Sequence, residues 1–371
     1  MKKMKFLLYV FFLCAPLTVA AQDIEVNAKN FPDDFFRSYL LNQDYGKDGI
    51  ITAAEIQQIT LVDVNYGQIS SLKGIEHFTA LENLTCYAND QLVFLDVSHN
   101  IAMTILDCGG CPLTKLDVSH NTALTMLTCY NNLLTDLDIS HNTALNFLDC
   151  TYNMLTELDV SHNTALSRFG CNNNQLKELD VASNAALMEF HCERNLLTKL
   201  NLPHNDVLRW VFCNDNNLTS LDASHNTSLE NLDCSRNQLT DLDVSGCTAL
   251  AFFDCSTNQI KGASMDAFIN SLPQVNKKEL RIYNDMYGNE GNVITKSQVA
   301  AAKAKGWIPC YYDYDLSAWK EYEGSNDDPA SIAMPEIENG NASVYNLSGQ
   351  KEASPVKGGI YVVGGKKVVV K

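Results

Sequence analysis

Evenly spaced cysteines and histidines are the residues of this chain whose types could support chemistry. Nine cysteines recur along the chain: the first interval is 22 residues and the next seven are each 21 residues. Six histidines each stand at the same place within such an interval. Thiolates and imidazoles bind zinc and copper, and neighbouring thiols form disulfides, so metal and redox chemistry must be weighed. The cysteines are Cys86, Cys108, Cys129, Cys150, Cys171, Cys192, Cys213, Cys234 and Cys255, and the histidines are His99, His120, His141, His162, His204 and His225.

A second candidate for chemistry is the acidic segment D-Y-G-K-D-G-I-I-T-A-A-E at 44–55. It fits the calcium loop of an EF-hand at the first, fifth, sixth, ninth and twelfth positions, but Gly46 at the third position removes one ligand. Helices are expected on both sides of the loop, over 32–41 and 53–59. We expect either a Ca²⁺ site or a metal-free helix-loop-helix, and both would cap the chain that follows. The expected ligands are Asp44, Asp48, Ile50 through its carbonyl, Thr52 and Glu55.

The cysteine spacing belongs to a longer sequence repeat, which indicates a stack of equivalent coils. One coil reads L-x-x-L-x-C-x-x-N-x-L-T-x-L-D-V-S-H-N-T-A over 145–165, and its first eleven positions match the leucine-rich repeat pattern with cysteine in place of the third leucine. Since one coil cannot bury its apolar edge alone, neighbouring coils must stack as parallel strands about 4.8 Å apart. Leu148 and Cys150 then point inward, and Phe147 and Asp149 point outward. We predict a leucine-rich repeat solenoid with a curved parallel sheet and a mostly extended convex side.

This architecture gives the cysteines and histidines a structural explanation. Inward cysteines act as small hydrophobic residues, so we expect reduced thiols; a disulfide framework is the alternative, although the number of ladder cysteines is odd. Cys111 and Cys247 stand where other coils have asparagine, and a thiol can partly replace the amide as a donor, which also explains the C-G-G-C-P run at 108–112. The histidines are expected to be repeated turn residues. Two alternatives stay open for them: a metal shared by neighbouring imidazoles, and destabilisation of the stack below about pH 6.5.

The C-terminal end of the repeat array has longer coils. Helices are expected over 263–272 and 296–305, and strands over 280–283 and 308–312. Atypical terminal coils of this kind cap the exposed core of a solenoid. Counting the intervals places Cys310 as one further inward rung of the cysteine ladder.

The two termini carry segments outside the solenoid. Residues 1–21 combine a lysine-rich start, an apolar run and small residues before Gln22, which is typical of a cleaved secretory signal. A lipoprotein signal centred on Cys14 is disfavoured, because no small residue precedes that cysteine. Removal of this segment takes the formal net charge from -17 to -20, and such acidity argues against nucleic acid and anionic membranes as partners. No later apolar run is long enough to span a membrane.

The repeats resemble a known family. Residues 24–320 are similar to the internalin-like bacterial surface proteins, in particular to their cysteine-ladder (internalin J-type) branch, whose repeats carry the same L-x-x-L-x-C-x-x-N pattern. This resemblance implies a solenoid at the cell surface or in the medium that acts by binding, often in adhesion, and not as an enzyme. The strand-like sequences of 339–371, which end in G-G-I-Y-V-V-G-G-K-K-V-V-V-K, resemble the final strands of C-terminal sorting domains of the type IX (Por) secretion route. That match is shorter than a full sorting domain, so two alternatives stay open: the tail directs export and attachment to the envelope, or it is a relic of such a domain.

These observations divide the chain into six parts. The signal peptide is followed by a helical N-terminal cap with the EF-hand-like loop, the repeats, the capping repeats, a polar linker and a small β-strand tail. The respective ranges are 1–21, 22–60, 61–260, 261–322, 323–338 and 339–371.

Binding is best sought where the outward strand positions differ between coils. Most coils place Asp, Thr, Ser or Asn there, whereas the fifth to seventh coils carry aromatic and charged side chains of the kind enriched in recognition sites. We therefore expect the concave face to bind an extracellular protein or glycan of host or neighbouring cells; random surface variation is the alternative. A structural spacer or biofilm matrix component, and a glycan-active enzyme on a β-helix, are competing interpretations. The expected binding residues are Tyr130, Phe147, Tyr152, Arg168, His191, Glu193, Arg194, Trp210, Phe212 and Phe252.

Overall fold

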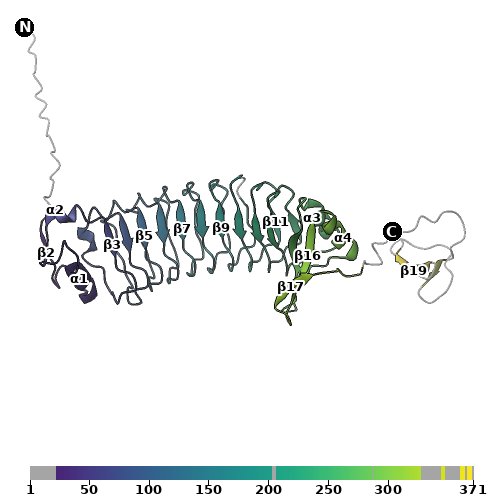
Figure 1. Ribbon diagram of the computed structural model, residues 1–371, viewed down its shortest axis with the longest axis horizontal. Coiled ribbons are helices and arrows are strands. Elements are labelled where there is room, and N and C mark those ends of the chain that lie inside the picture. Colours follow the sequence, from purple (N-terminus) through teal and green to yellow (C-terminus); the bar gives the residue numbers. More distant parts are fainter. Residues whose placement is uncertain are drawn as a thin grey trace, which may run out of the picture.

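The protein is a leucine-rich repeat solenoid, as the repeat predicts (Figure 1). The computed structural model describes residues 22–202, 206–286 and 288–326, together with the backbone of 344–346, 360–363 and 366–369. The expected signal peptide, His204 and most of the expected linker lie outside these residues. Within the described part of the chain, no helix has the length and apolar character needed to cross a membrane.

A sheet of 13 strands runs along the solenoid in the order β17-β16-β15-β14-β12-β10-β9-β8-β7-β6-β5-β4-β3. All its neighbouring strands are parallel except β17, which is antiparallel to β16. Neighbouring repeat strands come from successive coils and pair in register, so Phe147 lies beside Arg168 and Leu148 lies beside Phe169. The repeat strands are β3 (Leu61–Asp63), β4 (Asn83–Thr85), β5 (Ile105–Asp107), β6 (Met126–Thr128), β7 (Phe147–Asp149), β8 (Arg168–Gly170), β9 (Glu189–His191), β10 (Trp210–Phe212), β12 (Asn231–Asp233) and β14 (Phe252–Asp254).

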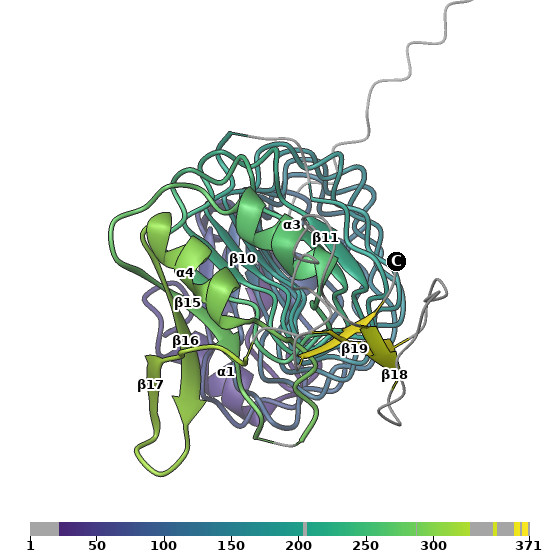
Figure 2. The ribbon, with the colours of Figure 1, turned by 90° about the vertical axis from the view of Figure 1, so that its right-hand side faces the viewer.

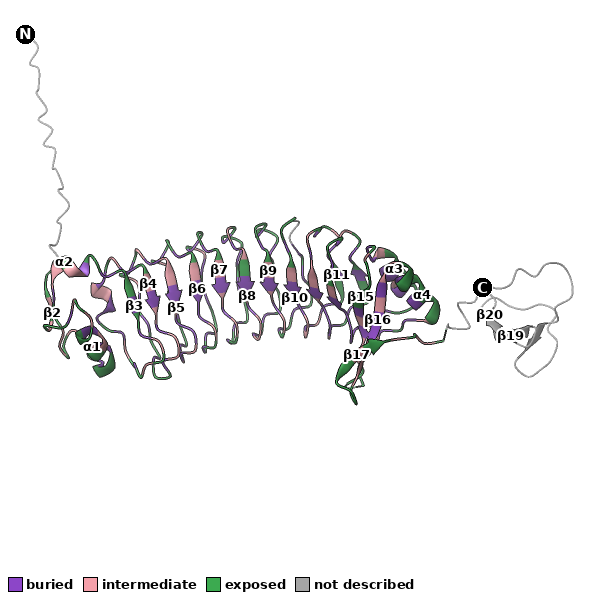
Figure 3. Cartoon of the chain, viewed as in Figure 1, coloured by how far each residue is buried: buried purple, intermediate pink, exposed green. Residues whose placement is uncertain are grey.

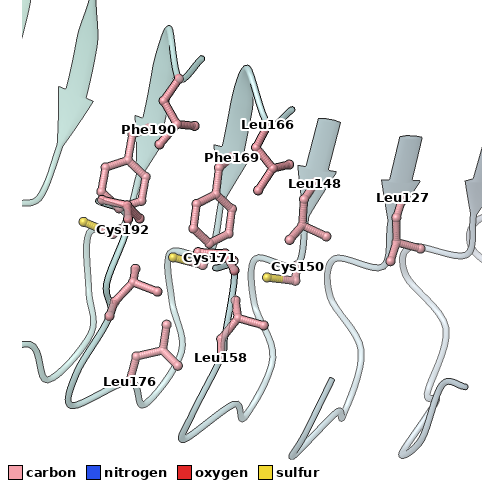
Figure 4. Close-up of a cluster of buried hydrophobic side chains, with 14 of the residues drawn as sticks. Leu127, Leu148, Cys150, Leu158, Leu166, Phe169, Cys171, Leu176, Phe190 and Cys192 are labelled. Carbon is pink, nitrogen blue, oxygen red and sulfur yellow. The ribbon is translucent and has the colours of Figure 1, made fainter. Parts of the chain in front are cut away.

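The core is built from the leucines and cysteines that repeat with the coil. Leu148 and Cys150 are both fully buried, and Figure 4 shows the equivalent residues of neighbouring coils in rows. Phe169 and Phe190 replace leucine in one row, and their rings stack with centroids 5.5 Å apart. Each buried side chain of this size stabilises the fold by about 1.5–3 kcal/mol. The row arrangement, more than any single contact, holds the coils together.

The cysteines of the described residues are free and buried, as the ladder interpretation predicts. Burial raises the pKa of the Cys150 thiol well above its ordinary value, and the same holds for Cys192 and Cys234. A thiol with a raised pKa stays protonated and is a poor nucleophile and metal ligand. The ladder cysteines therefore act as packing residues.

Asparagine ladders fix the turns between coils. Asn132 donates from Nδ2 to the carbonyls of Cys108 (3.0 Å) and Cys129 (2.9 Å), and its Oδ1 accepts from the Leu113 amide (3.0 Å). One side chain thereby satisfies three backbone groups from its own and the preceding coil, which would otherwise be buried without partners.

Two cysteines replace asparagine in these ladders, as predicted. The Cys111 thiol lies 3.3 Å from the carbonyl of Cys86, and the Cys247 thiol lies 3.1 Å from the carbonyl of Ala223. Both carbonyls hold the position that receives an asparagine Nδ2 in the other coils. These contacts explain C-G-G-C-P without redox or metal chemistry.

The convex side is extended, and only two segments of its described part pair as strands: β11 (Ser220–Asp222) and β13 (Asp241–Asp243). Most coils make a tight turn in which an aspartate accepts from the residue two positions on, as Asp159 does from the Ser161 amide at 2.8 Å. The following histidine is exposed, and the Nδ1 of His162 lies 3.2 Å from the Ser161 hydroxyl. Turn geometry therefore accounts for the D-V-S-H sequence.

The N-terminal cap closes the core with short elements: β1 (Ile24–Glu25), α1 (Asp34–Leu41), β2 (Ile50–Ile51), α2 (Ala53–Ile56) and the 3-10 helix Ile75–His77. Both helices are shorter than expected. Asp33 is the N-cap of α1, and its carboxylate accepts a hydrogen bond from the Phe36 amide at 2.9 Å. The same carboxylate accepts from the amide and hydroxyl of Ser70, both at 2.8 Å, so it ties the cap to the first coil.

The C-terminal cap is formed by α3 (Ala263–Ser271), β15 (Lys278–Tyr283), α4 (Lys296–Ala304) and β16 (Trp307–Asp313), followed by the edge strand β17 (Ala318–Glu321). Figure 2 shows α3 and α4 at this end of the solenoid. Trp307 is fully buried, 6.0 Å from the ring of Phe253, and its Nε1 donates to the carbonyl of Pro273 at 2.9 Å. The two helices lie where the sequence predicts them, whereas β17 was not expected.

Cys310 is not a further rung of the ladder. It pairs with Arg281 in the sheet, and Arg281 lies beside Asp254 on the outward side. Cys310 is buried, but interval counting paired it with the inward Ile282, whereas the two strands pair it with the outward Arg281; the register irregularity between Arg281 and Tyr283 follows that pair. Beyond the linker, β18 (Val344–Asn346), β19 (Ile360–Val363) and β20 (Lys366–Val369) form the antiparallel sheet expected of the tail.

Candidate binding surface

The outward surface of the long sheet is called the concave face here. Because the coils are in register, equivalent outward residues of successive coils lie side by side in columns, and Figure 3 shows them alternating with buried residues along the strands. The first outward column contains Met126, Phe147, Arg168, Glu189, Trp210, Asn231 and Phe252. The second outward column contains Thr128, Asp149, Gly170, His191, Phe212, Asp233 and Asp254.

Four residues of β8, β9 and β10 form a contact network, which we call the central cluster: Arg168, Glu189, His191 and Phe212. Glu189 interacts with both bases, through Oε1 to His191 Nε2 at 2.9 Å and through Oε2 to Arg168 Nε at 3.6 Å. The His191 ring stacks on the Phe212 ring, with centroids 4.7 Å apart and planes inclined by 16°. Three of these residues were expected. Glu189 was missed, although its place between Arg168 and Trp210 in a regular column was a usable signal.

Three further expected residues border the central cluster. Phe147 and Trp210 are half-buried and lie next to Arg168 and Glu189, respectively, in the first outward column. Glu193 lies 3.8 Å from His191 Nδ1, and burial raises the pKa of its carboxyl. The fifth to seventh coils therefore present one contiguous patch with aromatic, acidic and basic side chains.

Two expected residues lie away from this patch. Tyr130 belongs to a row of tyrosines nearer the N-terminus, with its ring centroid 5.7 Å from that of Tyr87, and burial raises the pKa of its hydroxyl. Phe252 lies nearer the C-terminus, where the Arg281 guanidinium is 4.7 Å from its ring centroid. Both side chains are engaged with neighbours of their own, so they do not extend the central cluster.

Tyr152 and Arg194 are placed in turns, at the edge of the concave face rather than on its strands. Their φ angles are 52° and 56°, in the left-handed region, and Asn131 and Asn173 hold the same position in other coils with φ angles of 51° and 54°. Asparagine and glycine tolerate this conformation best. In the sequence, asparagine recurs at this position, directly before the ladder asparagine, and this recurrence indicates a turn.

A pair of acidic residues on the same face was not anticipated. Asp233 and Asp254 lie side by side in the second outward column, and Asp254 is only 7% exposed. Burial, and then the charge of Asp233, raise the pKa of Asp254 to about 7, against the opposing effect of Ser256 and Arg281. Burial also raises the pKa of Asp233. The pair is therefore sensitive to pH in the neutral range.

The expected calcium ligands do not converge in this structure. Asp44 is fully exposed and pairs with Lys47 at 3.1 Å, while Asp48 Oδ1 accepts from the Ile50 amide at 3.1 Å. Thr52 and Glu55 form a capping box at the start of α2, in which Glu55 Oε2 accepts from the Thr52 amide at 2.9 Å. The described residues contain no group of three or more His, Cys, Asp or Glu side chains placed to hold a metal ion. This arrangement fits a cap, and calcium binding stays a prediction.

The parallel sheet, the repeated coil and the asparagine ladders define a leucine-rich repeat solenoid with a diversified concave face. Comparison with known proteins gives no match to any family model or curated protein. Among solved structures, the functional domain of InlJ from Listeria monocytogenes, which includes a cysteine ladder, is 31% identical with a TM-score of 0.64, over 80% of this chain and 69% of that chain. The chain belongs to this internalin-like, cysteine-ladder family of leucine-rich repeat proteins.

Two more distant structures share the fold. The internalin InlF from Listeria monocytogenes is 22% identical with a TM-score of 0.58, over 79% of this chain and 92% of that chain. A leucine-rich repeat protein from Leptospira interrogans is 22% identical with a TM-score of 0.56, over 69% of this chain and 67% of that chain. The fold is therefore found in proteins of more than one bacterial lineage.

Proposed function

We propose that this protein is a secreted or cell-surface, adhesin-like binding protein that recognises an extracellular protein or glycan through its concave face. The difference between the two faces of the solenoid carries this proposal. Asp117, Asp138 and Asp159 repeat on the convex side and make the same turn in each coil. On the concave face, equivalent positions hold an aromatic, a basic or an acidic residue. Since every coil has the same backbone, this variation is not a requirement of the fold.

Two other functions fit the concave face less well. A spacer or matrix component has no need for a diversified patch with stacked and ion-paired side chains. A hydrolytic or lyase site needs a base next to a nucleophile or a bound substrate. The contacts of His191 on the concave face are instead with Glu189, Glu193 and Phe212. Binding without catalysis is therefore the proposed role.

Export and attachment complete the proposal. The N-terminal sequence has the form of a cleaved secretory signal. The antiparallel sheet of β18, β19 and β20 agrees with a β tail of the sorting-domain type, through which the protein would be attached to the envelope. A fusion of a reporter protein to the tail, followed by cell fractionation, tests this part separately.

The binding proposal is tested with the purified protein on an array of extracellular proteins and glycans. Removal of a large side chain at an interface centre weakens binding by about 2 kcal/mol or more, which is roughly 30-fold in Kd. We expect this loss for Trp210→Ala and for Phe212→Ala. Thr156→Ala, an exposed change on the convex side, serves as the control and leaves Kd unchanged. Equal binding by all three variants would exclude the concave patch as the site.

A further inference from the structure

Gly170 interrupts the second outward column, in which the neighbouring coils carry the side chains of Asp149 and His191. Its backbone is ordinary extended strand, outside the left-handed region. A Cβ at this position would lie 3.1 Å from Thr151 Cγ2 and 3.5 Å from Asp149 Oδ1, both of them side-chain atoms. Gly246 is different, because a Cβ there would lie 1.8 Å from the Ser224 carbonyl oxygen. A Cβ at 170 would therefore press on a neighbouring side chain, whereas one at 246 would clash with the backbone.

A cavity of about 300 Å³ lies beside Gly170 on the concave face, and we call it the Gly170 pocket. This volume is at the lower end of the range for small-ligand pockets, about 300–1,000 Å³. Phe147 forms an apolar wall, and Asp149 lies next to Gly170 in the second outward column. Arg168, Glu189 and His191 also line the pocket, which therefore adjoins the central cluster, and Thr151 and Asn172 lie at its other side.

Not every charged side chain of the pocket has a partner of opposite charge. Glu189 interacts with Arg168 and His191. Within the described part of the chain, the Asp149 carboxylate accepts a hydrogen bond from the amide of Thr151, at 3.0 Å, and forms no ion pair with a basic side chain. A carboxylate beside an aromatic wall is suited to a long cationic side chain, because methylene groups pack on the ring while the charged end reaches the acid.

We propose that the Gly170 pocket receives a lysine or arginine side chain of a basic protein partner. This inference rests on the proposed function and makes its ligand more specific. The formal net charge of -17 favours association with a basic partner over long distances. The side chain packs against Phe147 and pairs with Asp149, and the central cluster contacts the surface around it.

The test uses a small probe, so it does not need the natural partner. The purified protein is titrated at pH 7.5 with Nα-acetyl-lysine methylamide, and with the uncharged norleucine analogue as the matched probe, while the backbone amides of Thr151 and Asn172 are followed by NMR. We expect saturable shifts with lysine alone, with Kd on the order of 1 mM.

Two variants remove the pocket in different ways. Gly170→Thr fills it with a residue that holds the same outward position in other coils, at Thr85 and Thr128, although the Thr151 side chain must shift slightly because a Cβ at 170 would lie 3.1 Å from its Cγ2. Asp149→Asn keeps the turn and removes the charge. Both are expected to weaken lysine binding at least about tenfold, the equivalent of 1.4 kcal/mol. Asn231→Thr, on the same face in β12, is the control and leaves Kd unchanged.

Each outcome is decisive for the pocket. Equal binding of the norleucine analogue, or full binding by Gly170→Thr, overturns the cationic-anchor proposal. Saturation of the same amides by N-acetylglucosamine but not by lysine overturns it in favour of a glycan pocket. Loss of array binding in Trp210→Ala without any lysine response would reject the pocket and leave the proposed function intact, so the two failures are distinguishable.

Discussion

Replacing Asp254 by asparagine should stabilise the protein, and the gain should depend on pH. The Asp254 carboxylate is buried beside Asp233, which raises its pKa to about 7. Its Oδ1 accepts from the amide (3.0 Å) and the hydroxyl (2.7 Å) of Ser256. Asparagine retains an oxygen for these two hydrogen bonds, so Asp254→Asn removes the charge without removing the turn.

The magnitude follows from the difference in pKa between the folded and unfolded chain. A folded pKa of about 7, against about 3.9 when unfolded, means that the folded protein binds the proton more tightly. The free energy of unfolding therefore falls as pH rises from about 4 to about 7. About three pKa units at 1.36 kcal/mol each set an upper limit near 4 kcal/mol for the destabilisation at pH 8. We expect Asp254→Asn to recover about half, or roughly 2 kcal/mol, because the new amide group is itself buried.

Thermal unfolding of both proteins at pH 8 and pH 4 measures this effect. A gain of 2 kcal/mol corresponds to a rise in Tm of about 3 °C for a protein of this size. At pH 4 the difference should fall below about 1 °C, since Asp254 is then protonated in the folded wild type. Asp107→Asn is the matched control: it lies in the same column, is only half-buried, and has Thr85 and Thr128 as neighbours.

Two results would refute this reasoning. A lower Tm for Asp254→Asn at pH 8, or an equal gain at pH 8 and pH 4, would show that the buried charge does not destabilise the folded protein. A similar gain in Asp107→Asn would show that the effect is a general reduction of negative charge and not a property of the acidic pair.

Three further predictions concern the scaffold. Unfolding in the absence of reductant should release the full complement of thiols in a colorimetric thiol assay, and a low count would support disulfides in place of the packed ladder. Asp33→Ala should lower the free energy of unfolding by about 2–4 kcal/mol in denaturant titrations, because it removes a helix cap and the hydrogen bonds to Ser70, whereas the exposed Asp34→Ala should have little effect. If the loop binds calcium, Ca²⁺ should raise the Tm of the wild type but not of Glu55→Gln, which keeps the capping-box acceptor; an unchanged wild-type Tm would make the loop a metal-free cap.

The repeat made most of the fold predictable. Each regular coil repeats the conformation of the one before it. Once one position is known to point inward, such as Leu148, the equivalent residue of every regular coil is expected to point inward too. The substitutions Cys111 and Cys247 were predictable for the same reason. Where the period ends, prediction weakened: Cys310 was assigned to the inward row, because the pairing of β15 with β16 is a property of two strands and does not follow from counting intervals.

The candidate site was predictable in position but not in its contacts. Sequence variation located Arg168, His191 and Phe212, but it did not show that Glu189 links the two bases. The recurring asparagine marked the left-handed turn that holds Tyr152, but its large aromatic side chain led to its assignment to the binding face. Contacts between side chains depend on rotamers and on burial by neighbouring coils, neither of which is encoded in a single coil.

Sequence alone therefore determined the coil and its register, together with the inward leucines and cysteines and the asparagine ladders. All of these follow because the same sequence pattern repeats at a constant interval along the chain. Tertiary structure decided which outward residues meet. It brought Phe147, Asp149 and Gly170 together in one cavity, because these residues come from different coils or strand positions that meet only when the coils stack. It raised the pKa of Asp254 because stacking places one acid beside another away from water. Both effects arise between coils, from distances that the chain acquires only when it stacks.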